Sequence, residues 1–405
     1  MCFVYFFFVH SIFGQTTSQE VAHYKSINQN LNAPTRIAVD KSDHIYVIDS
    51  FFNTINKYDS SGNLLKTYNL ENYQPVCIAI NSKNQLFFGA KNNGNIYRLH
   101  ENESVALVYS GLVTPVDMVF SPDDQLYISD GNLKVVIKID ASGALKQTIS
   151  NISLLSPSSL VFDQQNKRLL VADAGIVGGG GSFGTTPCTI HVFNLDGTYV
   201  GNFGSGAKAS LFGNGTANIG DAKFNRIQGM SLGKCNNIYV SDPFQGSVTV
   251  FNENLTFITR FGAYGTTLGQ LNVPLDIEFD SQERIIISSM NNGSIEIFSI
   301  ADVLPSSNIY NANQTICSET STTSIPIHFT GTAPWNFTYS HNGVAQTPIT
   351  TSENPYLLVV SEAGVYEVSA LSDLNTIGTC FTGSATISKQ LEAVTSLIQN
   401  SDAVL

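Results

Sequence analysis

The segment PTRIAVD at residues 34–40, followed by IYVID at 45–49, INKY at 55–58 and GNLLKTY at 62–68, is typical of four short strands separated by polar turns. The pattern recurs along the chain. Its middle-strand positions are spaced by 41, 40, 43, 69 and 47 residues, and they are Tyr46, Phe87, Tyr127, Leu170, Tyr239 and Ile286. The spacing of 69 is one period of 41 plus 28 inserted residues. Four strands in a period of about 40–45 residues indicate a β-propeller blade.

Six such units lie between Pro34 and about Ile300, so we expect an all-β chain built on a six-bladed β-propeller. The sixth unit contains only three strands. Residues 21–27 have the pattern of a fourth strand, and a connector typical of the repeat follows them. We therefore expect residues 21–27 to pair with the strand Ser294–Ile300 and close the ring, which leaves no free sheet edge.

The repeats resemble the NHL family. The resemblance rests on IYVIDSFFNTI at 45–55 with YDSSG at 58–62, and on LYISD at 126–130 with IDASG at 139–143. It implies an NHL-type six-bladed propeller over residues 21–304. The chain departs from the family pattern at Thr54, where the family commonly has an arginine.

A second all-β pattern begins near Ser306, with alternating strands at 324–329, 335–339, 356–360 and 364–370. It resembles the Ig-like or PKD-like modules of bacterial surface proteins, which implies a small β-sandwich over residues 306–389. In such a module Trp335 would fill the core and Tyr366 would make a tyrosine-corner contact. Residues 390–405 are interpreted as a linker or tail.

Composition and the N-terminus indicate an exported protein. Charged residues are only 13% of the chain, and the net charge is −12 with no basic block, which argues against nucleic-acid binding. Residues 1–15 contain an apolar run that matches a signal peptide and is too short to span a bilayer. We expect a secreted or cell-surface protein with no membrane span, either a monomer or part of a larger surface assembly.

The cysteines show no metal-binding spacing. No cofactor is therefore predicted, although calcium in the propeller channel stays open. Cys317 precedes the first strong strand of the sandwich and Cys380 precedes the last, so we expect them to form a disulfide. Cys77, Cys188 and Cys235 are expected to be reduced.

The central channel is the first candidate site. In a propeller the innermost strand of each blade lines the channel, and the residue two after each strand start lies near its mouth. This row reads Arg36, Cys77, Asp117, Ser159, Gly229 and Asp276. Units three and six face each other in a six-fold ring, which places Asp117 opposite Asp276. With Arg36, these carboxylates could bind a cation or polar ligand or shift each other's pKa, or they could only hold water and backbone groups.

The second candidate site is a face rich in long loops. Strand parity places the connections 175–187, 205–221 and 263–270 on one side of the propeller, where they would form a continuous rim. The apolar anchors of this rim would be Phe183, Phe212 and Tyr264, and the polar ones Lys208, Asp221 and Lys223.

These two sites lead to different functions. The first hypothesis is a non-enzymatic extracellular binding or adhesion protein, which recognises a protein or glycan through the loop-rich face. The alternative is a propeller enzyme, a lyase or metal-dependent lactonase, which acts in the channel around Asp117 and Asp276. A purely structural segment of a surface assembly is a third reading.

Overall fold

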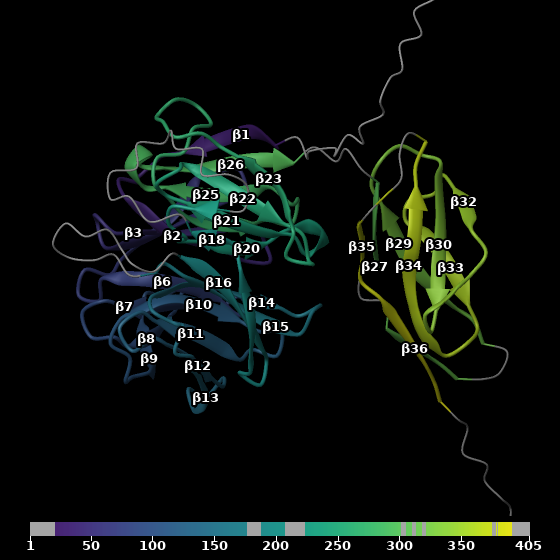
Figure 1. Cartoon of the computed structure of the whole chain (residues 1–405), viewed down its shortest axis with the longest axis horizontal. Coiled ribbons are helices and arrows are strands. Elements are labelled where there is room, and N and C mark those ends of the chain that lie inside the picture. Colours follow the sequence, from purple (N-terminus) through teal and green to yellow (C-terminus); the bar gives the residue numbers. More distant parts are fainter. Residues whose placement is uncertain are drawn as a thin grey trace, which may run out of the picture. The chain divides into compact units, whose positions relative to one another are not determined.

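The computed structural model describes residues 21–175, 188–206, 223–300, 305–309, 313–317, 321–374, 378 and 380–390 (Figure 1). The chain forms two compact units, Met1–Ala301 and Asp302–Leu405. Nearly all the regular structure is β, with two 3-10 helices, η1 (Lys234–Asn236) and η2 (Met290–Asn292). Among the described residues, no helix is long and apolar enough to cross a membrane. The expected signal peptide lies outside the described residues, as does all but the first residue of the expected tail.

The described part of the first unit contains six four-stranded antiparallel sheets. Their strands are β2 (Pro34–Val39), β3 (Ile45–Asp49), β4 (Thr54–Tyr58) and β5 (Leu64–Asn69); β6 (Pro75–Ile80), β7 (Leu86–Ala90), β8 (Ile96–Leu99) and β9 (Val105–Tyr109); β10 (Pro115–Phe120), β11 (Leu126–Asp130), β12 (Val135–Ile139) and β13 (Leu145–Ile149); β14 (Pro157–Asp163), β15 (Arg168–Asp173), β16 (Thr189–Asn194) and β17 (Tyr199–Phe203); β20 (Met230–Leu232), β21 (Ile238–Asp242), β22 (Ser247–Phe251) and β23 (Phe257–Phe261); and β24 (Pro274–Phe279), β25 (Ile285–Ser289), β26 (Ser294–Ile300) and β1 (Val21–Ile27). A short parallel pair, β18 (Ser205–Gly206) and β19 (Lys223–Phe224), lies between β17 and β20.

The first strands of the six sheets contact one another in a closed circle. Strand β2 contacts β6, β6 contacts β10, β10 contacts β14, β14 contacts β20, β20 contacts β24, and β24 contacts β2. Five of the six second strands are buried along their whole length, and the sixth, β15, is buried except at Arg168, because neighbouring sheets cover both faces. The fourth strands consist mostly of half-buried and exposed residues, which places them at the outer edge.

The N-terminal strand completes the last sheet, as the sequence predicts. Strand β1 pairs antiparallel with β26, from Val21 opposite Ile300 to Ile27 opposite Ile295, with one irregularity between His23 and Lys25. Figure 1 shows β1, in purple, beside the green strand β26. Two segments from opposite ends of the unit thus share one sheet, and β26 has no free edge.

A repeated aspartate stabilises the turns between sheets. The carboxylate of Asp130 accepts hydrogen bonds from four backbone N–H groups, those of Val113, Thr114, Asn132 and Leu133. Asp49 has the same kind of environment at the end of β3. Such a carboxylate satisfies amides that no strand partner reaches. Asp49 and Asp130 therefore have a structural role, which is to hold the turns that follow the second strands.

The second unit is the expected two-sheet sandwich. Its strands are β27 (Ser306–Ile309), β28 (Gln314–Ile316), β29 (Thr323–Phe329), β30 (Trp335–His341), β31 (Val344–Ala345), β32 (Ile349–Thr351), β33 (Tyr356–Val360), β34 (Gly364–Ser372), β35 (Cys380–Thr382) and β36 (Ala385–Lys389). One sheet has the order β33-β29-β27-β35, and the other contains β28, β36, β34, β30, β31 and β32. Trp335 is buried in the shared core, and the Tyr366 hydroxyl donates to the Glu362 carbonyl at 2.9 Å, as a tyrosine-corner contact requires.

The expected disulfide between Cys317 and Cys380 is wrong. Cys317 is a free, exposed thiol, whereas Cys380 is disulfide-bonded. Cys317 follows β28, and Cys380 begins β35 in the other sheet, so spacing along the chain did not reveal their separation. Cys235 is also disulfide-bonded and not reduced as expected, while Cys77 and Cys188 are free and buried.

Candidate functional site

Three of the predicted channel residues meet inside the circle of first strands. Arg36 comes from β2, Asp117 from β10 and Asp276 from β24. The Arg36 Nη1 atom lies 3.3 Å from Asp276 Oδ1 and 4.0 Å from Asp117 Oδ1. All three residues are buried. The alignment of repeats therefore identified side chains that are far apart in the sequence and close in space.

This ion cluster also holds the first strands together. Arg36 Nη2 donates to the Ser158 carbonyl at 2.8 Å, and Nη1 donates to the Gln228 carbonyl at 3.2 Å. Asp276 Oδ2 accepts the backbone N–H of Ile37 at 2.8 Å. The cluster therefore has a structural role, because it connects main-chain groups of several sheets.

Asp117 is bound in the same way by the next sheet. Its Oδ2 atom accepts the backbone N–H of Leu160 and the hydroxyl of Ser159, both at 2.8 Å. Gly229, which belongs to the same row, allows close approach of two strands, since a Cβ there would lie 2.6 Å from the Asp276 Cα. The residues of the predicted channel row are therefore packed against the main chain of neighbouring sheets.

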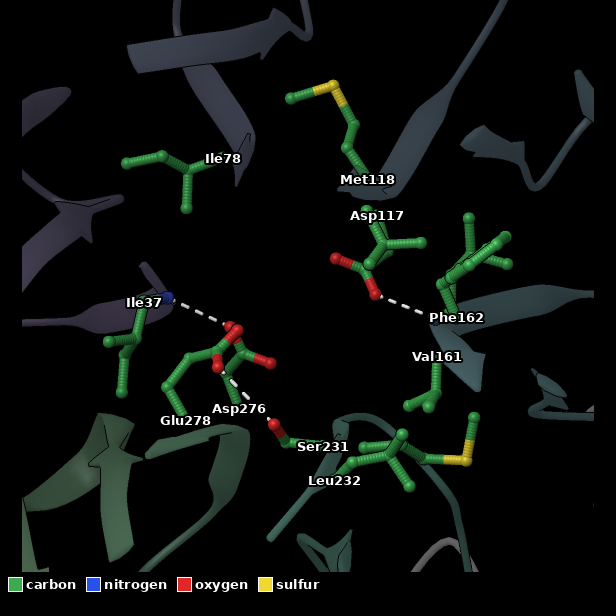
Figure 2. A pocket seen from close by; sticks show the side chains of 13 residues that line it. Ile37, Ile78, Asp117, Met118, Val161, Phe162, Ser231, Leu232, Asp276 and Glu278 are labelled. Carbon is green, nitrogen blue, oxygen red and sulfur yellow. Dashed lines mark hydrogen bonds between the residues drawn. The ribbon is translucent and has the colours of Figure 1, made fainter. Parts of the chain in front are cut away.

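A cavity of about 180 Å³ lies beside this cluster. We call it the central cavity. It is lined by residues of all six first strands: Ile37 of β2, Ile78 of β6, Asp117 to Val119 of β10, Leu160 to Phe162 of β14, Met230 to Leu232 of β20, and Asp276 and Glu278 of β24. Figure 2 shows the acidic groups among apolar walls.

The central cavity contains one acidic residue that the sequence analysis did not single out. Glu278 lies two residues after Asp276 on β24, so both side chains point to the same face of the strand. The Glu278 Oε2 atom accepts a hydrogen bond of 3.3 Å from the Ser231 hydroxyl, which Figure 2 marks with a dashed line. The sequence does distinguish Glu278: at the equivalent position of the first strand, four residues after its start, the other five repeats have Ala, Val or Ser.

The pKa values of Asp276, Glu278 and Arg36 are all raised. Burial raises the pKa of Asp276 to about 7, a rise that Arg36 opposes and Asp117 reinforces. It also raises the pKa of Glu278 well above its usual value, and the neighbouring Asp276 and Asp117 add to the rise. For Arg36, burial works against the charge, but Asp117 and Asp276 outweigh it and raise the pKa of the guanidinium. Glu278, whose pKa is raised, therefore lies beside an aspartate whose pKa of about 7 lets it take or release a proton near neutral pH.

The described residues contain no group of three or more His, Cys, Asp or Glu side chains arranged to hold a metal ion. The residues that line the central cavity include no histidine.

Of the residues predicted for the loop-rich rim, the two that the structure describes, Lys223 and Tyr264, do not line this cavity. Phe183, Lys208, Phe212 and Asp221 lie outside the described residues. Lys223 and Tyr264 are exposed, and they precede β20 and β24, at the amino ends of the first strands. The central cavity instead extends from the middle of the first strands toward their carboxyl ends, to Phe162 and Leu232. The rim and the cavity are thus separate candidate sites.

Solved structures with a similar fold are β-propeller proteins. A putative gluconolactonase has 13% sequence identity and a TM-score of 0.51, and the match covers 70% of this chain and 93% of that one. The virginiamycin B lyase of Staphylococcus aureus has 14% identity and a TM-score of 0.49 over 69% of this chain and 100% of that one. A gluconolactonase of Xanthomonas campestris has 13% identity and a TM-score of 0.49 over 67% and 86%. At such identities the likeness shows the fold alone.

The second unit has a separate match. The family model described as "Nucleoporin POM152, Ig-like domain" matches residues 305–382. The search of curated proteins found no match. The first unit therefore has a β-propeller fold and the second an Ig-like one, whereas membership of the NHL family stays a prediction.

Proposed function

We propose that the six sheets are the blades of a six-bladed propeller and that its central cavity is the active site of a lyase-type enzyme. This is the alternative function of the sequence analysis. One observation carries it: Glu278 and Asp276, two carboxyl groups whose pKa values are raised, lie on the same face of β24 and line one cavity. Two carboxyl groups whose pKa values are shifted in one pocket form a natural acid–base pair.

The proposed reaction is an elimination next to a carbonyl group. Ionised Asp276 takes a proton from the carbon beside the carbonyl, and the bond between the neighbouring carbon and its oxygen substituent breaks. Glu278 gives its proton to the departing oxygen. The products are an unsaturated carbonyl compound and an alcohol or acid. Asp276 then holds the proton taken from carbon and Glu278 is ionised, so loss of a proton from Asp276 to solvent and uptake of one by Glu278 restore both groups.

Arg36 positions the base in this scheme. Its contact with Asp276 keeps part of the aspartate ionised at neutral pH, because the guanidinium lowers the pKa that burial raises. The size of the cavity limits the substrate. Its volume of about 180 Å³ is below the range of about 300–1,000 Å³ for drug-sized ligands, which points to a single small ring or short chain.

We favour elimination over metal-dependent lactone hydrolysis. The proposal rests on the raised pKa values of the two carboxyl groups, since the likeness to lactonases concerns the fold. The disulfide bonding of Cys235 and Cys380 also leads us to propose a secreted or cell-surface location, because structural disulfides persist in oxidising compartments.

The test is an assay of small carbonyl compounds that carry an alkoxy or acyloxy group on the neighbouring carbon, together with small cyclic esters. Formation of the conjugated alkene is followed by ultraviolet absorbance. Glu278→Gln and Asp276→Asn should each lose turnover, while Met118→Leu, a volume-conserving change in the same wall, should keep it. A metal chelator should have no effect.

Two results would contradict the proposal. One is the absence of alkene formation with every compound in the panel. The other is turnover that survives Glu278→Gln. The loop-rich rim gives an independent control: Tyr264→Ala should leave turnover unchanged, because Tyr264 does not line the central cavity.

A further inference from the structure

A second cavity, of about 420 Å³, lies at the amino ends of the first strands. It is bounded by the connection between β23 and β24, by η2 between β25 and β26, and by the end of β1. We call it the rim cavity. It shares no lining residue with the central cavity, so the two sites can be tested separately.

A buried carboxylate forms the base of the rim cavity. Glu296 of β26 is 4% exposed. Its Oε1 atom accepts the Ser294 hydroxyl at 2.6 Å, and its Oε2 atom accepts the Ser26 hydroxyl at 2.6 Å and lies 2.8 Å from His23 Nε2. Both carboxylate oxygens therefore already have protein partners. A ligand cation would have to compete with these contacts for the carboxylate.

The wall formed by the β23–β24 connection is held in place. The Asn292 side-chain nitrogen donates to the carbonyls of Gly265 at 3.3 Å and Gln270 at 3.1 Å. Gly269 has a positive φ and packs on the His23 side chain, where a Cβ would lie 3.0 Å from the His23 Cβ. The β23–β24 connection is thus held against η2 by Asn292 and against β1 by the contact between Gly269 and His23.

One polar atom of this wall has no protein partner. The Asn292 Oδ1 atom is buried and accepts no hydrogen bond from the described residues. A buried acceptor without a donor is costly.

The chemistry of the lining selects an uncharged ligand rich in hydroxyl groups. Seven of the nine lining residues have a hydroxyl or amide side chain, and the single charged residue, Glu296, is already bonded. Hydroxyls and amides both donate and accept hydrogen bonds, as sugar hydroxyls need. Leu268, 80% exposed at the edge, offers an apolar contact for the C–H face of a ring. We propose that the rim cavity binds neutral saccharides.

The volume fits this ligand class. About 420 Å³ lies within the range of about 300–1,000 Å³ that is usual for small-molecule sites, enough for one or two sugar rings. Such binding is independent of the proposed elimination reaction. It would hold the protein on a glycan surface while the central cavity acts on another molecule.

The experiment uses the full chain and a panel of glucose, galactose, mannose and N-acetylglucosamine with their β-linked disaccharides. Saturation-transfer NMR detects binding, and calorimetry measures the affinity. The double variant Asn28→Ala/Leu268→Ala alters two exposed lining residues. Its matched control, Asn132→Ala/Leu133→Ala, alters an exposed pair at the same end of the first strands but outside the cavity.

We expect at least one saccharide to bind, the lining variant to weaken that binding by about tenfold or more, and the control to match the wild type. Asp276→Asn should leave saccharide binding unchanged even where it abolishes turnover, which separates this proposal from the proposed function. Failure of the whole panel to bind would overturn the inference, as would equal affinities of the lining variant and its control.

Discussion

Replacing Arg36 with methionine should destabilise the first unit, because it removes the cation between two buried carboxylates. Arg36 Nη1 lies 3.3 Å from Asp276 Oδ1 and 4.0 Å from Asp117 Oδ1. The guanidinium also donates to two carbonyls, through Nη2 to Ser158 and through Nη1 to Gln228. Removal of one partner from a buried ion pair costs about 3–5 kcal/mol. The expected fall in the melting temperature is on the order of 10 °C.

The penalty should depend on pH in a defined direction. The folded-state pKa of Asp276 is raised to about 7, so in the wild type its protonated form contributes stability at low pH that is lost as the pH rises toward about 7. Arg36 lowers this pKa, and the variant should therefore raise it further. Above about pH 7 the variant should therefore lose stability more steeply than the wild type, by up to about 1.4 kcal/mol per pH unit.

Urea unfolding followed by circular dichroism at mildly acidic and at alkaline pH measures both effects. The chain has one tryptophan, Trp335 in the second unit, and its fluorescence should report an unchanged transition. Adding Asp276→Asn to the Arg36→Met variant should remove the pH-dependent part of the penalty. The reasoning is refuted if Arg36→Met unfolds like the wild type, or if its penalty shrinks as the pH rises.

Three further predictions concern the frame of the structure. Removing residues 21–27 should destabilise the first unit, because β26 loses its partner strand, and equal melting temperatures with and without these residues would contradict the closure. Asp130→Ala should lower the free energy of unfolding by about 3 kcal/mol, because four backbone amides lose their acceptor. Asp140→Ala, in an exposed turn, should lower it much less, and similar losses for the two variants would argue against a structural role for Asp130. Cys317 should react with a maleimide in the folded protein, while the two other free cysteines react only after unfolding; recovery of Cys317 in a disulfide-linked peptide would contradict this.

The repeat could be predicted from the sequence because its cause is local. In the first strand of each sheet every second side chain points toward the channel. The second strand is apolar because neighbouring sheets cover both its faces. The same register placed Arg36, Asp117 and Asp276 at one level. Their contact then follows from the circle of first strands, which makes residues 240 positions apart neighbours.

Other features depend on three-dimensional detail that spacing does not contain. Glu278 escaped notice because only one inward level of each strand was considered, although the next level held a further acid of the central cavity whose pKa is raised. The pairing of Cys317 was wrong because two residues can flank one module and still belong to different sheets. The rim cavity arises from how the β23–β24 connection folds over β1, and loop length alone does not predict that shape.

The claim that the propeller holds a protonated carboxyl group for proton transfer is tested most directly by measuring the pKa of Glu278. Carbon-13 NMR of protein labelled at the glutamate carboxyl carbons gives the titration of each group, and Glu278→Gln assigns the relevant signal. The account predicts a signal that stays in the protonated form through neutral pH. A carboxyl group that ionises near its ordinary value of 4.5 would contradict it.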